Sequence, residues 1–174
     1  PPPNVLSKIG SPFETISLEH VSFTYPSRTE PSLLDVSMQI RRGEVIALVG
    51  ENGSGKTTLA KLLAGLYEPT KGRVRWDGTE LAALDPSFVR NQVAVIFQDF
   101  ARYFLTAREN IAMGKPSRMN DWSEIERAAK ESGADRFLSS LPDGYNTILG
   151  PEFFGGSDLS GGQWQRIALA RAYL

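Results

Sequence analysis

The chain has 174 residues, of which 41% are hydrophobic and 22% charged, and its formal net charge at pH 7 is −1. This length and composition suit one globular domain with a buried core. The near-neutral charge gives no reason to expect DNA or RNA as a partner. The sequence contains no cysteine, which excludes disulfide bonds, zinc–thiolate sites and thiol nucleophiles. No apolar run approaches the roughly 20 residues of a membrane helix, so any membrane association is expected to need another polypeptide or a segment outside this sequence.

Residues 1–13 predict a linker or an extended arm, because they contain four prolines and no hydrophobic periodicity. A strand is expected next. Ile16 and Leu18 alternate with polar residues, and Val21 and Phe23 alternate in the opposite phase. The change of phase predicts a β-bulge near residue 20, the single histidine, to which we assign no functional role.

Four further strands are expected in the first part of the chain. The apolar positions of the first, an alternating strand, are Leu34, Val36, Met38 and Ile40. A continuous apolar run at 45–49 predicts a buried strand, and a short strand is expected around 74–76, before a turn at residues 77 and 78. A second continuous run at 93–97 is typical of a strand covered on both faces of a parallel sheet.

A glycine-rich stretch follows the run at 45–49 and precedes apolar residues at helical spacing. It reads Gly50-Glu51-Asn52-Gly53-Ser54-Gly55-Lys56-Thr57-Thr58. The stretch matches the phosphate-binding pattern G-x-x-x-x-G-K-[ST] in its strand–turn–helix context. A glycine turn before an ordinary helix is the alternative, but a chance match at all four fixed positions is rare.

The residue types in this stretch suit a triphosphate. Gly50, Gly53 and Gly55 allow a tight turn that directs backbone N–H groups to one point. The following helix adds the positive end of its dipole at that point. Lys56 places a mobile charge on the β- and γ-phosphates, and the Thr57 hydroxyl can ligate Mg²⁺. We therefore predict a nucleoside triphosphate site here.

The second half of the chain changes from strand-like to helical patterns. Residues 106–113 and 121–140 are predicted to be helical, and the second of these regions has a capping signal at Asp121 and a stop signal at Gly133. Residues 142–158 are rich in glycine, proline and aspartate and are expected to form a loop.

A second glycine-rich turn opens a predicted helix that runs to residue 174. It reads Leu159-Ser160-Gly161-Gly162-Gln163. A hydroxyl at the N-cap, two glycines and the N–H groups of a helix start make a second, incomplete anion site. A flexible helix cap is the alternative interpretation, and the complete phosphate cradle earlier in the chain favours the anion site.

Together, the two glycine-rich motifs resemble those of the nucleotide-binding domain of ATP-binding cassette (ABC) transporters, from about Glu19 to the C-terminus. This resemblance implies an α/β fold: a P-loop NTPase core with an antiparallel β subdomain and an inserted α-helical subdomain. It implies ATP and Mg²⁺ as ligands. The residues implied to bind ATP in the same chain are Tyr25, Asn52, Gly53, Ser54, Gly55, Lys56, Thr57 and Thr58. Those implied to bind ATP in trans, across a pair of domains, are Ser160, Gly161, Gly162 and Gln163.

Two single residues take their roles from the same resemblance. Tyr25 is similar to the aromatic residue on which adenine stacks, and a core aromatic at a strand end is the alternative. Gln98 resembles the glutamine that meets Mg²⁺ and the attacking water, so it is the implied catalytic residue and, with Thr57, the implied metal ligand. Residues 108–111 resemble the segment that follows this glutamine in exporters.

The resemblance also implies a division of the chain. Residues 1–13 are expected to be an arm from a membrane domain, and residues 14–174 an incomplete ABC nucleotide-binding domain. Within it, the P-loop core and β subdomain are expected over 14–98, the glutamine loop and helical subdomain over 99–158, and the signature helix over 159–174. The family's Walker B aspartate, catalytic glutamate and switch histidine, which should follow this helix, are absent. We therefore expect this fragment to bind ATP but barely to hydrolyse it.

For the intact parent protein, the resemblance implies an ATPase that couples ATP binding and hydrolysis to membrane transport, with export as the expected direction. The expected partners are transmembrane domains, fused or separate, and a second nucleotide-binding domain, identical or different, at the cytoplasmic face of a membrane. A soluble ABC ATPase that acts on nucleic acid or ribosomes is the alternative, and an unrelated P-loop kinase or nucleotide sensor is a third possibility. A Rossmann dehydrogenase is excluded, because its motif needs a glycine where Thr58 stands.

Overall fold

The computed structural model describes residues 13–150 and 157–174. The chain divides into two compact units, Pro1–Val93 and Ala94–Leu174. Most of the predicted N-terminal arm, and the part of the predicted loop at 151–156, lie outside the described residues.

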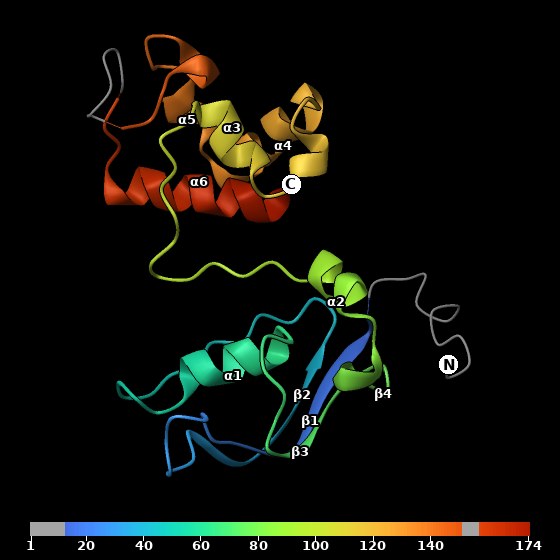
Figure 1. Ribbon diagram of the computed structural model, residues 1–174. Helices are drawn as coiled ribbons and strands as arrows, with labels where there is room; N and C mark the ends of the chain where they lie inside the picture. Colours follow the sequence, from blue (N-terminus) through green and yellow to red (C-terminus); the bar gives the residue numbers. More distant parts are fainter. Residues whose placement is uncertain (1–12, 151–156) are drawn as a thin grey trace. The chain divides into compact units, whose positions relative to one another are not determined.

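The first unit is built on a four-stranded antiparallel sheet with the strand order β2-β1-β3-β4 (Figure 1). Its strands are β1 (Thr15–Phe23), β2 (Leu33–Arg41), β3 (Lys71–Trp76) and β4 (Thr79–Glu80). Because alternate side chains of a strand share a face, β1 directs its apolar positions into one core. The antiparallel β subdomain expected from the sequence is confirmed.

The predicted bulge lies in β1 and has a counterpart in β2. The pairing shifts between Leu18↔Met38 and Val21↔Val36, and both His20 (φ 50°) and Asp35 (φ 52°) adopt left-handed backbone conformations. The bulge at Asp35 changes which side chains of β2 face the core. Leu33 is therefore buried at 8% exposure, whereas Leu34 is 74% exposed. The predicted alternating strand is confirmed as β2, but Leu34 does not share the core-facing side of Val36, Met38 and Ile40 for this reason.

The predicted turn at residues 77 and 78 joins β3 to β4. Asp77 (φ 46°) and Gly78 (φ 79°) both have positive φ, as a two-residue hairpin turn requires. The Asp77 carboxylate also accepts hydrogen bonds from the backbone N–H groups of Glu14 (2.9 Å) and Thr15 (2.7 Å). The turn thus fixes the start of β1 as well as the hairpin.

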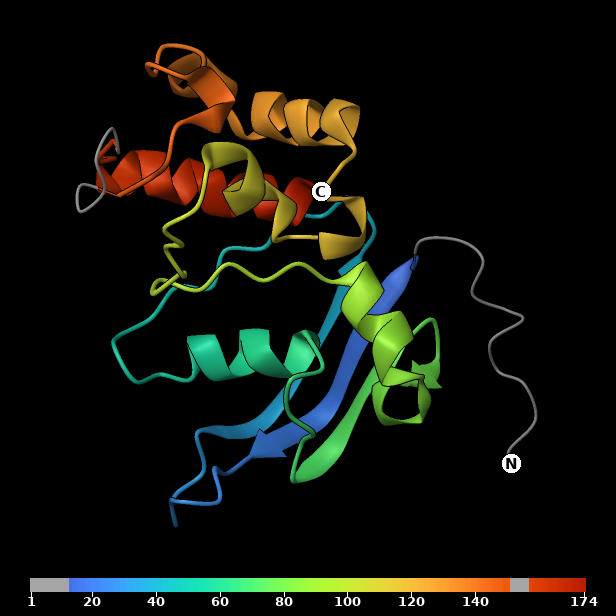
Figure 2. The ribbon, with the colours of Figure 1, turned by 45° about the horizontal axis from the view of Figure 1, so that its top comes forward.

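Helix α1 (Lys56–Leu63) covers one face of this sheet (Figures 1 and 2). Its residues Leu59 and Leu62 are buried in the core of the sheet, as the helical spacing of the leucines predicts. The short 3₁₀ helix η2 (Leu81–Ala83) and helix α2 (Pro86–Gln92) follow β4. The other members of the core cluster are Ile16, Leu18, Val21, Phe23, Leu33, Val74, Trp76, Leu84 and Val89.

The apolar runs at 45–49 and 93–97 do not form the buried strands predicted for them. Neither run is assigned as a strand, and Val45 and Val49 are 98% and 94% exposed. In the second run, Phe97 is 38% exposed. A strand in a parallel sheet exists only with hydrogen-bonded neighbours and cover on both faces. Within the described residues, no strand pairs with either run, so neither run forms a strand despite its apolar residues.

The second unit consists of helices packed on its last helix, α6 (Gly161–Tyr173). Helices α3 (Ala107–Ala112) and α4 (Trp122–Ser132) both pack on α6 (Figure 2). The shorter elements are η3 (Pro116–Arg118), α5 (Asp135–Leu138) and η4 (Gly144–Asn146). The shared core cluster includes Ile111, Ile125, Leu138, Leu149, Trp164 and Ile167.

The helix ends follow the capping signals of the sequence. Asp121 accepts a hydrogen bond from the backbone N–H of Glu124 (3.3 Å) at the start of α4, and Gly133 (φ 71°) closes its end. The predicted helices at 106–113 and 121–140 are confirmed, with Gly133 separating α4 from the short helix α5. At the start of α3, Thr106 and Glu109 form a reciprocal capping box.

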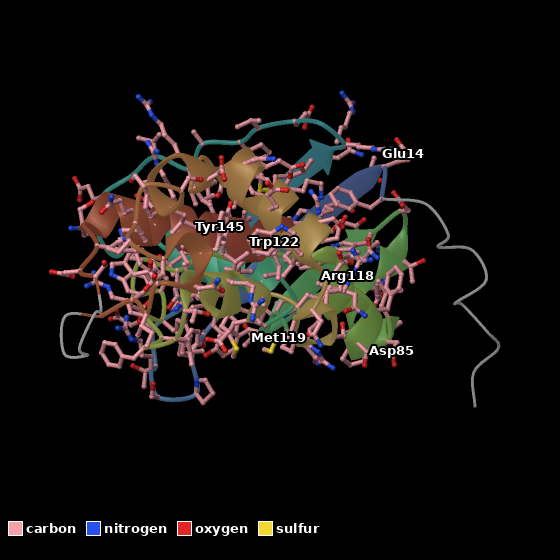
Figure 3. The ribbon with its side chains drawn as sticks, turned by 90° about the horizontal axis from the view of Figure 1, so that it is seen from above. Glu14, Asp85, Arg118, Met119, Trp122 and Tyr145 are labelled. Atoms are coloured by element: carbon pink, nitrogen blue, oxygen red, sulfur yellow. The ribbon has the colours of Figure 1, made fainter. Side chains whose placement is uncertain are left out.

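An aromatic pair ties the start of α4 to η4 and α5. The rings of Trp122 and Tyr145 meet edge to face with centroids 4.8 Å apart, and Figure 3 shows the two side chains together. The Tyr145 hydroxyl donates to a carboxylate oxygen of Asp135 at 2.8 Å. Burial and this hydrogen bond raise the pKa of Tyr145 above its usual value, so the phenol stays protonated and keeps donating.

We expect the substitution Gly72→Ala to lower the free energy of unfolding by about 3 kcal/mol. Gly72 has φ 77°, and a Cβ there would overlap the backbone carbonyl oxygens of Glu19 and His20. Urea unfolding followed by circular dichroism measures the effect. The matched control is Gly43→Ala: its φ is 81°, but no described atom lies within 4 Å of the added Cβ, so a cost of about 1 kcal/mol is expected. Equal costs at the two positions would contradict the overlap at Gly72.

Candidate functional site

The glycine-rich turn before α1 has the backbone conformation that the motif requires. Gly53 and Gly55 both have φ 88°, in the left-handed region. At Gly55 a side chain is also excluded by space, because a Cβ would lie 2.5 Å from the Ser32 carbonyl oxygen. Asn52 and Ser54 are exposed on the same turn. Glycine is therefore needed at the N-cap of α1, where the chain turns into the helix.

The Lys56 ammonium group lies inside this turn. Its Nζ donates to the carbonyl oxygens of Gly50 (2.8 Å) and Glu51 (2.6 Å), and to the Ser54 hydroxyl (3.3 Å). These partners are neutral oxygens, so they position the ammonium group without neutralising its charge. The N–H groups of the first turn of α1 end at the same loop. The arrangement provides a cation and backbone donors for one anion.

The two threonines that follow have different environments. Thr57 is exposed on the first turn of α1. Thr58 is buried at 7% exposure, and its hydroxyl lies 3.2 Å from the Tyr25 hydroxyl. Of the two, Thr57 is the one whose hydroxyl is accessible to a ligand at the loop, which agrees with the role predicted for it.

Tyr25 lies in an aromatic cluster beside α1. Its ring meets Phe23 edge to face with centroids 4.8 Å apart, and Tyr67 in the same manner at 5.5 Å. Together with the hydroxyl contact to Thr58, these packings fix the position of the Tyr25 ring next to the helix that carries Lys56. The sequence predicts no role for Tyr67. The sequence feature that could have indicated Tyr67 is that it is an aromatic residue shortly after the predicted helix.

The second predicted anion site begins helix α6. The Ser160 hydroxyl accepts a hydrogen bond from the Gln163 N–H (3.3 Å), and the Gln163 side chain accepts one from the Ser160 N–H (2.9 Å). Ser160 is thus the N-cap predicted from the sequence, within a complete capping box.

Gly161 and Gly162 lie on the exposed first turn of α6. Neither has positive φ, and a Cβ on either would meet no described atom within 4 Å. Alanine is favoured over glycine in a helix by up to about 1 kcal/mol. The packing of the described residues therefore gives no reason for glycine at these positions. Because glycine has no side chain, a ligand or a partner chain can approach the exposed backbone closely here.

A hollow in the second unit includes this helix start. Of the described residues that line it, those with charge are Arg136 and Arg166, and Ser160, Gly162 and Gln163 form part of its wall. The Arg166 guanidinium also donates to the Gly133 carbonyl oxygen (3.2 Å) at the end of α4. The charged side chains that line this hollow are therefore both basic, which agrees with an anionic ligand there.

Gln98 is exposed in a turn that follows the run at 93–97, and it belongs to the second unit. The predicted site residues therefore form two groups. Tyr25 and residues 52–58 lie together in the first unit, and Gln98 and residues 160–163 belong to the second.

Two polar residues of the second unit have contacts that no sequence motif predicts. Asn110 is fully buried, and its side chain holds the segment after Gln98 together with Arg171 of α6. Their contacts join residues 61 and 70 positions apart in the sequence, so no local pattern predicted them. Among the described residues, no helix has both the length and the apolar character needed to cross a membrane.

Residues 33–174 match the model of the family described as ABC transporter. The chain is 40% identical over 165 residues to the subtilin transport ATP-binding protein SpaT of Bacillus subtilis, covering 95% of this chain and 27% of that protein. It is 43% identical over 174 residues to the toxin RTX-III translocation ATP-binding protein of Actinobacillus pleuropneumoniae, covering 99% and 24% of the two chains. With the leukotoxin translocation ATP-binding protein LktB of Mannheimia haemolytica, identity is 45% over 157 residues, covering 90% and 22%.

The fold is similar to that of a solved ABC exporter. The structure of a bacterial Atm1-family ABC exporter with ATP bound matches with a TM-score of 0.81 and 33% identity, over 92% of this chain and 27% of that one. The chain thus spans about a quarter of the length of the relatives and the structure that it matches. The expected α/β nucleotide-binding fold is confirmed by this likeness.

We expect Gly162→Ala to raise the free energy of unfolding by about 0.5 kcal/mol, because alanine restricts the unfolded chain and meets open space on α6. Urea unfolding measures the change. The control in the same unit is Gly114→Ala, which should destabilise, because its Cβ would overlap the Arg171 carbonyl oxygen. A destabilised Gly162→Ala variant would show that the fold itself requires this glycine.

Proposed function

The chain belongs to the ABC transporter family, and we propose that it is the ATP-binding domain of a membrane exporter that couples ATP binding and hydrolysis to transport. The observation that carries the proposal is the turn around Lys56. Its ammonium group is held by neutral oxygens at the start of α1, beside backbone donors, so it presents an uncompensated charge to a phosphate.

In this proposal, residues 52–58 bind the triphosphate and Tyr25 supports the adenine ring. The loop donors and the dipole of α1 meet the β- and γ-phosphates. The Tyr25 ring is fixed by its aromatic neighbours and by Thr58, so it offers a rigid surface for stacking. The base and the phosphates would then be bound by groups of one unit.

Mg²⁺ fits this site as an ion bound jointly by protein oxygens and by the phosphates of the nucleotide. Among the described residues, no cluster of three or more histidine, aspartate or glutamate side chains is placed to hold a metal. Mg²⁺ usually takes few protein oxygens and completes its shell with phosphates and water. The exposed Thr57 hydroxyl suits such a role, and Gln98 is the second proposed ligand. When bound, the ion would neutralise phosphate charge.

The start of α6 is proposed to bind the γ-phosphate of ATP held by a second nucleotide-binding domain. Gly161 and Gly162 leave the helix start open to close approach, and Arg136 and Arg166 line the adjoining hollow with positive charge. Such a contact exists only while the γ-phosphate is present, so ATP would favour the paired state and hydrolysis would release it.

The remaining partners are proposed from the relatives. The named relatives are described as transport or translocation ATP-binding proteins, and the matching structure is an exporter with ATP bound. We infer that transmembrane domains, fused or separate, are the partners of this chain and that it works at the cytoplasmic face of a membrane. Export is the proposed direction.

The 174 residues alone are proposed to bind ATP and to hydrolyse it very slowly. Gln98 is the proposed catalytic residue of this chain, because its amide can orient water. The family's catalytic glutamate has no counterpart after α6 within this sequence. Without a general base the loss in rate is expected to be about 10²–10⁴-fold.

Lys56→Ala should weaken ATP binding by about 100-fold, because it removes a charge-assisted contact to the phosphates. Calorimetric titration of the 174-residue chain with Mg-ATP measures the affinity. The control Lys130→Ala removes an exposed lysine that pairs with Glu126, and it should bind ATP like the wild type. Equal affinity of the Lys56→Ala variant would exclude the proposed site, and turnover equal to that of the longer relatives would refute slow hydrolysis.

Two inactive variants of the full transporter should restore activity when mixed. Lys56→Ala removes the charge in the phosphate loop, and Gly162→Asp places a carboxylate at the start of α6. In a mixed pair, one composite site holds both changes and the other holds neither. ATPase turnover of the mixture should therefore exceed that of either variant alone, to about a quarter of the wild-type value for random pairing of two sites that act independently. No gain on mixing would argue against binding in trans.

A further inference from the structure

The segment that follows Gln98 is held against helix α6. Residues 101–105 form neither helix nor strand, and Figures 1 and 2 show the chain passing α6 before it enters α3. Such a segment has no backbone ladder of its own, so its conformation depends on contacts from neighbouring elements.

Arg171, in the last turn of α6, supplies the central contacts. Its Nη1 donates to the Ala101 carbonyl oxygen at 2.6 Å. Its Nε donates to the Asn110 carbonyl oxygen, and its Nη2 to the Asn110 side-chain oxygen, both at 2.8 Å. The guanidinium group also lies 4.9 Å from the centre of the Tyr103 ring. The flat, forked guanidinium reaches all these partners at once, which a lysine ammonium group cannot do.

Asn110 completes the network from the side of α3. Its side chain is fully buried, and its amide nitrogen donates to the carbonyl oxygens of Tyr103 (2.9 Å), Leu105 (3.1 Å) and Thr106 (3.1 Å). With its oxygen bound to Arg171, both ends of the amide are used. A buried, fully satisfied network of this kind favours one geometry of the backbone that it binds.

A second contact joins the same segment to the first turns of α6. The Arg102 guanidinium lies over the ring of Trp164, at 5.9 Å from its centre. Trp164 follows Gln163 directly and is buried at 3% exposure. The segment is thus attached near both ends of α6, at Trp164 and at Arg171.

We propose that Arg171 is a positioning residue of the ATPase. It fixes the segment after Gln98 to helix α6, so that Gln98 and the helix start at Ser160 keep one relative geometry. This inference rests on the proposed function, because Gln98 and Ser160 act on ATP only there. Arg171 itself does not touch the nucleotide in this scheme. It acts through the backbone that carries Gln98.

The test is Arg171→Lys in the full transporter, with ATPase kinetics and hydrogen exchange as the two measurements. Lysine keeps the charge but loses the forked contacts. We expect kcat to fall about tenfold while KM for ATP changes less than about twofold, because the phosphate loop around Lys56, the main proposed ATP contact, is unchanged and only the alignment for reaction is lost. Amide exchange over 101–106 should become faster.

Arg127→Lys is the matched control. Arg127 also donates to a carbonyl oxygen at the end of α6, that of Tyr173 (3.0 Å), but its other partners are Glu124 and Glu131 on its own helix. It should leave kcat and the exchange of 101–106 unchanged. An unchanged kcat in Arg171→Lys, or an equal loss in Arg127→Lys, would overturn the inference.

Arg102→Gln decides the question if Arg171→Lys does not fold. Arg102 is exposed in the segment itself, so this variant is expected to fold. A kcat lower by about threefold at constant KM supports the inference, and an unchanged kcat overturns it. If the wild-type transporter shows no ATP turnover, the proposed function fails. The exchange data for 101–106 then decide alone, and equal exchange in wild type and Arg171→Lys would show that Arg171 does not fix the segment.

Discussion

The first turn of an α-helix leaves backbone N–H groups without intrahelical partners, and both proposed phosphate contacts depend on this property. The two helices treat it differently. Within the described residues, no side chain caps α1, whose N-cap is Gly55, so its donors are left for a ligand. Helix α6 is capped by Ser160 and Gln163, which already satisfy part of its first turn. This difference agrees with α1 as the main phosphate site and α6 as a weaker contact made across a pair of domains.

The local features of the fold were predictable from sequence because they depend on neighbouring residues. The bulge near His20, the turn at Asp77 and the cap at Ser160 each follow from residues within a few positions. The buried strands at 45–49 and 93–97 were not, because an apolar run becomes a strand only when distant segments pair with it. The exposure of Leu34 was not predictable for a related reason, because the bulge in β2 depends on the pairing of β2 with β1.

The candidate site shows the same division between local and distant contacts. The loop around Lys56 is a continuous motif, and its hydrogen bonds span at most six residues. The contacts of Arg171 with Asn110 and Ala101 join residues 61 and 70 positions apart in the sequence, so no local pattern predicts them. Tyr67 belongs to the same class, because its contact with Tyr25 depends on the return of the chain after α1. Tertiary packing therefore decides which polar and aromatic residues support a motif.

The hydrogen bond between the hydroxyls of Tyr25 and Thr58 joins the end of β1 to the helix of the phosphate loop. Under the proposed roles, the surface for the purine and the loop that binds the phosphates are therefore joined by a direct contact between side chains. A ligand would then contact both groups only if its sugar and phosphate chain spans the distance between them, so this distance would select among nucleotides by the length of that chain.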